Sequence, residues 1–577
     1  MPNDSRTPPN LPRRLAIWAG RACMIAALTG TTVPATAQSE VPQPGDTLTV
    51  ATLYTTLSPL SWDPADWSWK LNHDAGQVYE VLFSADLSKA VHRGGTQRFV
   101  IDGWLPPETV RGELAESWAL KDDPLRAEVR LRRGVMFPDK PGVMAARELT
   151  ADDVVASFER FNRSPKRIRE QFEHIDRVEA IDRHTVVFRF DRFDAMWQAR
   201  FGWGAFSAIV PPEVERAGAG NWRNVNGTGP FMLTDVVAGS HTTYTRNPDY
   251  WDHELLGGQR HRLPFVDKLV YRTLRDESTQ HAALRTAKID ILESVRWSAV
   301  DELKRSAPAL QWSRRLSTLG QYVALRTDVK PLDDPRVRRA LNIAIDKRQI
   351  VEAYYGGQAE LFAYPMHPEF QGYFEPLAAM PPSVRELFTH DLAKAKALLA
   401  QAGVPDGFVL KVQVCACDPD HMDLLPLLAA QLEKIGVRVE AQTMAYPAFL
   451  SAMTTRTNAA GYLARGGHLS PLVGLRRAFQ SDSIFNPAMY ANPDFDRRIV
   501  AAFEERDESR RQAEVRALTR EIVDAAPYIW LPTPYAFMAW WPWVRNYGGE
   551  LAAGFNRPGP IYARIWIDQK MKRSLGF

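Results

Sequence analysis

Cysteine is scarce in this sequence, with three residues among 577, at positions 23, 415 and 417. So few cysteines exclude the disulfide-stapled scaffold that stabilises many small secreted domains. The fold must therefore rest on a hydrophobic core, and a content of 45% hydrophobic residues is sufficient to build one. At about 150 residues per domain, the length predicts two to four domains.

A strong excess of charge is also missing, because the net charge is only +3. The first 37 residues account for it, with four arginines and one aspartate, and the rest of the chain holds equal numbers of basic and acidic residues. No run of five like charges interrupts this balance. Because binding of nucleic acid needs a basic excess or a basic stripe, we expect no nucleic-acid partner.

Long hydrophobic runs are absent, and no window of 18 apolar residues predicts a membrane span. The N-terminus instead shows a basic region ending at Arg21, a short apolar run at Ala22–Leu28 and the small residues Ala35–Ala37. This order is typical of an export signal, and we predict cleavage after Ala37 and a periplasmic mature protein. A disordered or interfacial N-terminus is the alternative.

Common catalytic motifs are missing as well. The sequence has no HExxH, no P-loop, no GxSxG and no paired CxxC, so the usual metal-hydrolase, nucleotide-binding and serine-nucleophile signals are absent. An exported hydrolase acting on carbohydrate or peptide stays open, because the two carboxylates of a glycosidase need no contiguous motif. We expect a protein without enzymatic activity and without a cofactor.

Strand patterns are present through the first half of the chain. Thr47–Leu53 places Leu48 and Val50 on one face, which is the two-residue period of a sheet. Further predicted strands are Ala127–Arg132, Thr185–Phe190, Phe231–Val237 and Lys268–Leu274.

Helix patterns are stronger, since several begin at a capping residue followed by apolar residues at helical spacing. These predicted helices are Ala151–Phe161 after Thr150, the helix begun by Asp334 and Pro335, Asp346–Tyr355, and the helix that opens at Asp391 and ends at Gly403. Phe408–Thr443 predicts a β-α-β unit whose helix lies at about Met422–Ile435. Such a unit implies a parallel sheet with a ligand-facing carboxyl edge.

Seven segments stand out along the predicted mature chain and together span most of it. They are Glu113–Asp123 (ELAESWALKDD), Val129–Asp139 (VRLRRGVMFPD), Leu149–Phe161 (LTADDVVASFERF), Asn226–Asp235 (NGTGPFMLTD), Arg246–Trp251 (RNPDYW), Asp333–Val351 (DDPRVRRALNIAIDKRQIV) and Asp391–Gly403 (DLAKAKALLAQAG). In sequence and in order, these segments resemble one known family, the solute-binding proteins of ABC transporters of the oligopeptide, dipeptide and nickel class, often called family 5.

The resemblance implies an α/β fold of the two-lobed, type II periplasmic binding protein class, with a third domain and mixed sheets flanked by helices. The function that it implies is capture of a peptide or similar small solute between two lobes and delivery to an ABC permease, by a monomer. The domain bounds that it implies are a signal peptide at 1–37, lobe I at 38–275 with an extra subdomain at about 61–200, lobe II at 276–525, and a C-terminal segment at 526–577 that returns to lobe I.

One segment departs from the family pattern. Peptide-binding relatives commonly carry an aspartate for the α-amino group of the peptide there, whereas Gly461–Pro471 has Arg465 and no acid. A cationic side chain suits a carboxylate, phosphate or sugar acid. We therefore expect an anionic or polyhydroxylated solute, or a modified peptide without a free N-terminus.

The candidate ligand-binding residues follow from position and residue type. Arg465 is the expected charge anchor, the two histidines are expected donors, and the aromatic residues are expected stacking walls. For the tryptophans, packing in a core is the alternative. The predicted set is Tyr54, Trp62, Tyr364, His367, Tyr462, Arg465, His468 and Trp541.

Cys415 and Cys417, with His421 close by, offer soft or borderline metal ligands. Their spacing matches no standard zinc pattern, so we predict no metal site. A metal or metal-chelate carrier remains a third hypothesis, and two free thiols or a local disulfide are the simpler interpretations.

Overall fold

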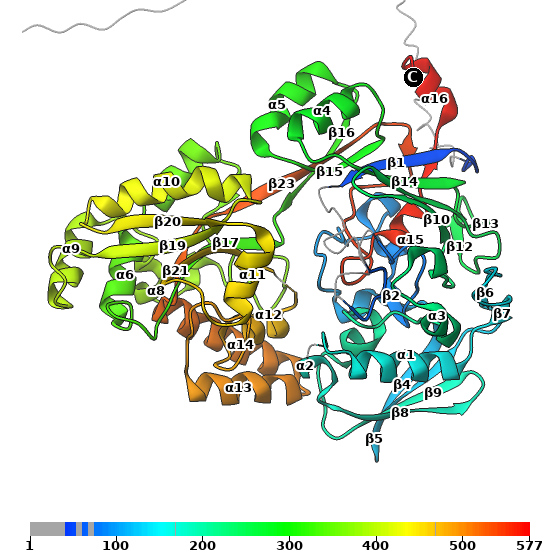
Figure 1. Cartoon of the computed structure of the whole chain (residues 1–577), viewed down its shortest axis with the longest axis horizontal. Helices are drawn as coiled ribbons and strands as arrows, with labels where there is room; N and C mark the ends of the chain where they lie inside the picture. Colours follow the sequence, from blue (N-terminus) through cyan, green and yellow to red (C-terminus); the bar gives the residue numbers. More distant parts are fainter. Residues whose placement is uncertain (1–40, 53–60, 67–73, 168, 468) are drawn as a thin grey trace, which may run out of the picture. The chain divides into compact units, whose positions relative to one another are not determined.

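The computed structural model describes residues 41–52, 61–66, 74–167, 169–467 and 469–577, in which Pro42–Phe577 form one compact unit (Figure 1). An eight-stranded sheet, a five-stranded sheet and a four-stranded sheet dominate it, together with several two-stranded pairs. Helices flank these sheets, in agreement with the predicted α/β class. Within the described ranges, no helix combines the length and apolar character needed to cross a membrane.

The first large sheet is organised around the N-terminal strand. β1 (Thr47–Thr52) lies parallel to β14 (Lys268–Thr273) on one side and to β15 (Ile291–Val295) on the other. Leu48 and Val50 are fully buried, as their alternation predicts. The order is β10-β11-β14-β1-β15-β23-β16, and β18 also pairs with β23. The other strands are β10 (Phe231–Val237), β11 (His241–Arg246), β16 (Gln311–Leu316), β18 (Ala359–Glu360) and β23 (Thr533–Trp540).

The four-stranded antiparallel sheet, in the order β4-β5-β9-β8, shares a hydrophobic core with the first large sheet, and we call the part of the molecule built on these two sheets the first lobe. Helix α1 (Ala151–Arg163) begins at a capping box, in which Asp153 accepts from the backbone N–H of Thr150 at 2.8 Å. Phe158 on its buried face meets Phe188 edge to face at a centroid distance of 5.0 Å. The strands are β4 (Ala115–Asp122), β5 (Leu125–Leu131), β8 (Ile175–Asp182) and β9 (Thr185–Phe190).

Shorter elements complete the first lobe. The strands are β2 (Phe83–Ala85), β3 (Val110–Gly112), β6 (Met136–Phe137), β7 (Arg147–Glu148), β12 (His253–Leu256), β13 (Gln259–Arg262), β24 (Val544–Arg545) and β25 (Trp566–Ile567). The helices are α2 (Arg169–Phe172), α3 (Pro212–Ala217), α4 (Glu277–Arg285), α5 (Trp297–Ser306), α15 (Gly559–Tyr562) and α16 (Gln569–Ser574).

The second lobe is built on the five-stranded sheet, in the order β20-β19-β21-β17-β22. β19 (Val409–Cys415) and β20 (Arg438–Met444) are parallel and joined by α10 (Pro419–Glu433), so the predicted β-α-β unit is confirmed. The predicted helix start at Met422 is three residues late. Asp418 caps the helix and Pro419 occupies its first turn, a pair that is a normal helix start.

The remaining elements of the second lobe follow the predicted pattern closely. α6 begins at Pro335 after its cap Asp334, and α9 begins after Asp391, as predicted. The strands are β17 (Leu319–Leu325), β21 (Gly461–Gly467) and β22 (Tyr528–Trp530). The helices are α6 (Pro335–Ala344), α7 (Lys347–Gln349), α8 (Pro382–Glu386), α9 (Leu392–Gln401), α11 (Tyr446–Thr454), α12 (Pro471–Phe479), α13 (Pro493–Glu504) and α14 (Glu508–Ala525).

Two short connections join the two large sheets, and β18, which lies between β17 and β19 in the sequence, also pairs with β23 of the first sheet. β16 ends at Leu316 in the first sheet and β17 begins at Leu319 in the second, whereas β22 ends at Trp530 in the second and β23 begins at Thr533 in the first. β15 pairs with β1, and β16 pairs with β23. Both strands therefore lie in the first sheet, although they follow residue 275, the expected end of lobe I. Strand pairing is non-local, so sequence position alone could not assign them.

A buried charge cluster ties the C-terminal segment to the first lobe. Arg557 donates two hydrogen bonds to Glu113, at 3.0 and 2.8 Å, and both side chains are almost completely buried. Glu80 lies in the same cluster and accepts from Tyr250 Oη at 3.2 Å and Trp251 Nε1 at 3.0 Å. Burial, reinforced by the negative charge of Glu113, raises the pKa of Glu80 to about 8.

This pKa predicts a pH-dependent stability. The pKa of Glu80 is near 4.5 in the unfolded chain and is raised to about 8 in the folded protein. The protonated carboxyl therefore contributes fully to the free energy of unfolding below pH 4.5, and this contribution is lost as the pH rises through 8. Glu80→Gln, which mimics the protonated acid, should be more stable than wild type at pH 8.5, and the difference should shrink toward pH 5. Urea denaturation at several pH values measures it, and a difference that does not change with pH would contradict the assignment.

The matched control removes the other acid of the cluster. Glu113→Gln takes the carboxylate from Arg557 and should lower the free energy of unfolding by roughly 3–5 kcal/mol across this pH range.

Candidate functional site

Two adjoining cavities lie where segments of both lobes meet. One measures about 340 Å³ and the other about 320 Å³. They share four lining residues from distant parts of the chain, so they are neighbouring compartments of one cleft. The shared residues are Leu469, Arg477, Phe485 and Phe555.

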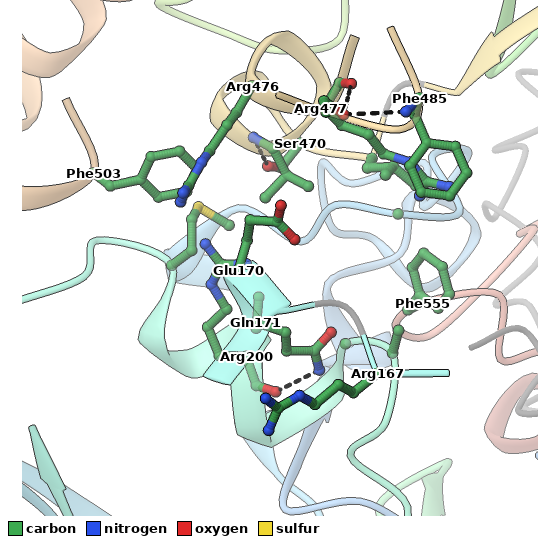
Figure 2. Close-up of a pocket in the computed structure, with 18 of the residues that line it drawn as sticks. Arg167, Glu170, Gln171, Arg200, Ser470, Arg476, Arg477, Phe485, Phe503 and Phe555 are labelled. Carbon is green, nitrogen blue, oxygen red and sulfur yellow. Dashed lines mark hydrogen bonds between the residues drawn. The ribbon is translucent and has the colours of Figure 1, made fainter. Parts of the chain in front are cut away.

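The first-lobe wall of the larger compartment is formed by α2 and by a π-helical turn at Ala199–Trp203. Arg200 is buried and donates to Asp194 at 3.1 Å, while Gln171 donates to the Arg200 carbonyl at 2.9 Å (Figure 2). Glu170 also lines this wall. These contacts fix the arginine so that its guanidinium faces the second lobe (Figure 2).

The second-lobe wall is helix α12, whose cap Ser470 accepts from the backbone N–H of Val473 at 3.0 Å. The helix presents two consecutive arginines to the cleft, and their environments differ. Arg476 donates to Glu173 of the first lobe at 2.6 Å and to Gln480 at 2.7 Å. It is therefore already neutralised by an ion pair across the cleft.

Arg477 is the contrasting case. Its guanidinium lies over the Phe485 ring at 3.6 Å from the centroid, and within the described part of the chain it forms no ion pair or side-chain hydrogen bond. Burial lowers the pKa of Arg477 to about 10, although the charge of Glu170 opposes this effect. The side chain remains charged at neutral pH, half-buried, and lines both compartments.

Aromatic rings form the floor of the smaller compartment. Tyr364 stacks on Tyr322 at a centroid distance of 5.3 Å, and Tyr322 stacks on Tyr528 at 4.1 Å. Gly320 and Gly466 pair across β17 and β21, and a Cβ atom at either would lie within 2.4 Å of the Tyr364 side chain. These two glycines leave the space that the ring occupies.

Arg465, the expected charge anchor, also lines the smaller compartment, but it is already paired. It donates to both carboxylate oxygens of Asp418, at 2.6 and 2.7 Å, and to Asp420 at 3.3 Å. Burial lowers the pKa of Arg465, but the charges of the two acids outweigh it and the net shift is upward. Its charge holds the end of β21 against the start of α10.

The other predicted residues are dispersed. Tyr364 joins Arg465 in the smaller compartment, whereas His367 lines a separate cavity of about 910 Å³. Tyr54 and His468 lie outside the described residues. The remaining three are buried: Trp62 in the first-lobe core, Tyr462 against Phe449 at 4.2 Å, and Trp541 against Trp543 at 4.6 Å. None of these three lines either compartment of the cleft or the separate cavity beside His367.

Several lining residues were missed. An isolated charged residue or phenylalanine does not mark a binding site in a sequence, so most of these residues could not be found there. The one available signal was the pair Arg476-Arg477, which lies on the helix that begins at Ser470-Pro471. The missed residues include Glu170, Arg200, Arg477, Phe485 and Phe555.

Cys415 and Cys417 form a disulfide at the end of β19. A disulfide sulfur is not a thiolate, and His421 lies 3.3 Å from Asp418, with its pKa lowered to about 4 by burial. Across the described residues, no group of three or more His, Cys, Asp and Glu side chains is arranged to hold a metal ion. The geometry thus favours the local disulfide over the other interpretations of this motif.

The disulfide predicts the thiol count of the protein from Gln38 onward, which retains only these two cysteines. Unfolded without a reductant, it should react with no thiol reagent, and after reduction it should take two labels. Mass spectrometry after iodoacetamide treatment measures this. The Cys415→Ser variant is the control, since its single remaining thiol should be labelled without reduction. Two labels on unreduced wild type would contradict the disulfide.

Comparison with known proteins is consistent with a cleft of this kind. Residues 109–471 match the model of the bacterial extracellular solute-binding proteins, family 5 (middle region). The chain is 28% identical over 468 residues to heme-binding protein A of Haemophilus influenzae, which covers 75% of this chain and 81% of that protein. It is 28% identical over 409 residues to di/tripeptide-binding protein 1 of Pseudomonas aeruginosa, at coverages of 67% and 70%.

A solved structure shows the same fold. The ABC transporter-associated periplasmic binding protein DppA of Helicobacter pylori, in complex with the peptide STSA, aligns with a TM-score of 0.73 at 24% identity. The alignment covers 91% of this chain and 99% of that one. The two-lobed binding-protein architecture predicted from the sequence is thereby confirmed.

Proposed function

The chain belongs to the bacterial extracellular solute-binding proteins of family 5, and from this premise we propose that it captures a small solute bearing a carboxylate, such as a peptide, for an ABC importer. The family resemblance seen in the sequence is confirmed. The solute is held between the lobes and released unchanged to the membrane permease. Export with cleavage after Ala37 and a monomeric state belong to this proposal.

The proposal depends on the side chain of Arg477. A half-buried guanidinium without an acidic partner is costly in a protein interior, and a carboxylate satisfies it with charge-assisted hydrogen bonds. Both relatives are named for carboxylate-bearing solutes, since peptides end in a carboxylate and haem carries propionates. Tyr322, Tyr364 and Phe485 supply broad apolar walls for the rest of the solute.

Arg477 replaces Arg465 as the proposed anchor. The two arginines line the same compartment, but Arg465 already holds Asp418 and Asp420, so an incoming anion would have to compete with two carboxylates. We assign Arg465 a positioning role in the second lobe. Tyr364 remains in the proposed site, as a wall beside Arg477.

Closure of the lobes is the proposed signal to the permease. The two chain crossings at residues 316–319 and 530–533 support a hinge there, and we propose lobe I as 38–316 with 533–577 and lobe II as 319–530. A solute that contacts both walls stabilises the closed form by its differential affinity.

The alternative function, an exported hydrolase, finds no support. The matched family and both relatives are described as binding proteins, and binding alone accounts for the cleft. We propose that the protein has no enzymatic activity. Incubation with di- and tripeptides should therefore return them intact by mass spectrometry, and turnover of any of them would contradict the proposal.

Substitution of Arg477 tests the anchor. Arg477→Met keeps the apolar part of the side chain and removes the charge. It should weaken binding of a mixed pool of dipeptides to pentapeptides by about 10- to 100-fold, which is the loss of affinity expected when one charge-assisted hydrogen-bonded contact is removed. Isothermal titration or native mass spectrometry measures affinity. An affinity within twofold of wild type would contradict the anchor.

Two neighbouring arginines serve as matched controls. Arg476→Met and Arg465→Met each remove a charge that is already paired, so each should lower the unfolding midpoint more than Arg477→Met does. Each should also weaken peptide binding less than Arg477→Met does.

A further inference from the structure

Two buried hydrogen-bond donors on the first-lobe wall of the larger compartment have no acceptor. Trp203 is only 2% exposed, and its indole Nε1 has no hydrogen-bond partner in the part of the chain that the structure describes. Arg200 is 6% exposed, and its Nε donates to Asp194 at 3.1 Å, but its Nη2 has no partner within the described ranges. Because a buried donor without an acceptor is destabilising, these two groups require an explanation.

Both donors come from the π-helical turn Ala199–Trp203, and the turn itself is well fixed. Gly204 donates its backbone N–H to the Ala199 carbonyl at 2.7 Å, and Phe555 donates its own to the Trp203 carbonyl at 3.0 Å. The guanidinium of Arg200 extends toward the second lobe (Figure 2). Turns of this kind are frequent at functional sites. The backbone groups named here are satisfied, so the unmet hydrogen-bonding capacity belongs to the two side chains at the cavity wall.

The same wall carries more positive than negative side chains. Its charged residues that line the larger compartment are Lys166, Arg167, Glu170 and Arg200. Asp194 offsets the charge of Arg200, which leaves two cations against the single acid Glu170. Arg167 donates to the carbonyl and to the side-chain oxygen of Asn162, both at 2.7 Å, and pairs with no acid of the described chain. Unused donors beside an excess of positive charge favour an oxyanion over a neutral acceptor.

We propose that Arg200 and Trp203 bind a second acidic group of the solute, such as the side-chain carboxylate of an aspartate or glutamate residue in a peptide, while Arg477 holds the first. The inference rests on the proposed function and narrows its ligand class to solutes with two acidic groups. Of the solute classes expected from Gly461–Pro471, it selects the anionic one. Arg167 adds attraction for such a solute at the edge of the same wall.

Matched tripeptides test the inference on the whole mature protein. The acidic set consists of alanine tripeptides with one glutamate at the first, second or third position, and the neutral set carries glutamine at the same position. The two members of each pair therefore differ by one charge at nearly constant shape. Wild type should bind the best acidic tripeptide at least about 10-fold more tightly than its glutamine counterpart. Isothermal titration measures both affinities and their ratio.

Two conservative variants each remove one of the donors. Trp203→Phe keeps an aromatic ring and loses the N–H, whereas Arg200→Lys keeps a positive charge beside Asp194 and loses the second guanidinium donor. Each should reduce the affinity ratio to below about threefold, by weakening the acidic tripeptide. Trp222→Phe is the matched control and should keep the wild-type ratio, because Trp222 packs against the Arg223 guanidinium at 4.5 Å and lines neither compartment.

A third variant acts in the opposite direction. Glu170→Gln removes the acid of this wall, which repels an incoming carboxylate, so it should raise the ratio of acidic to neutral affinity. A ratio lowered by this substitution would mean that Glu170 itself holds the solute, and it would overturn the inference.

The outcomes separate the two proposals. A wild-type ratio near one, or a ratio that survives both Trp203→Phe and Arg200→Lys, overturns the second acidic site. The carboxylate anchor then still stands if Arg477→Met weakens the acidic and the neutral tripeptides alike. If no tripeptide binds to wild type, both proposals are overturned. The ratio also controls for folding, since a loss of folded protein lowers binding of both members of a pair.

Discussion

The two short connections between the sheets, Ser317–Thr318 and Leu531–Pro532, are the constraint on which the rest of the structure depends. β16 pairs with β23 in one sheet and β17 with β22 in the other, so the crossings run side by side. Backbone hydrogen bonds continue through them, from Ser317 to Pro534 at 3.0 Å and from Leu531 to Gln321 at 3.3 Å. The lobes are thus joined by a narrow antiparallel ribbon, and the cleft lies between the surfaces that it connects.

The arginines that line the cleft differ in whether an acidic side chain pairs with them. Arg465 is held by Asp418 and Asp420, and Arg476 is held by Glu173, whereas the next residue along α12 pairs with no acid of the described chain. Consecutive helical residues point about 100° apart, so Arg477 faces Phe485 and both compartments. In the proposed function, the carboxylate of a solute offsets the cost of leaving this charge without an acidic partner in a half-buried position.

Local elements were predictable because their signals are local. Thr185–Phe190 and Phe231–Val237 are strands with the predicted bounds, and the caps Thr150, Asp334 and Asp391 begin helices as expected. The start of α10 was predicted three residues late, at Met422, although Asp418 and Pro419 form a normal cap and first residue. The fold class and family followed from many such segments in order, and the comparisons confirm both.

The site was far less predictable, because it depends on which distant side chains meet. Of the eight predicted residues, the structure brings Tyr364 and Arg465 together, while Trp62, Tyr462 and Trp541 pack into cores that their large apolar rings stabilise. By itself, the sequence determined the strands, the capped helices and the family, since periodicity and capping act over a few residues. Only the tertiary structure decided which charges are neutralised, because Arg465 and Asp418, or Arg476 and Glu173, become neighbours only after folding.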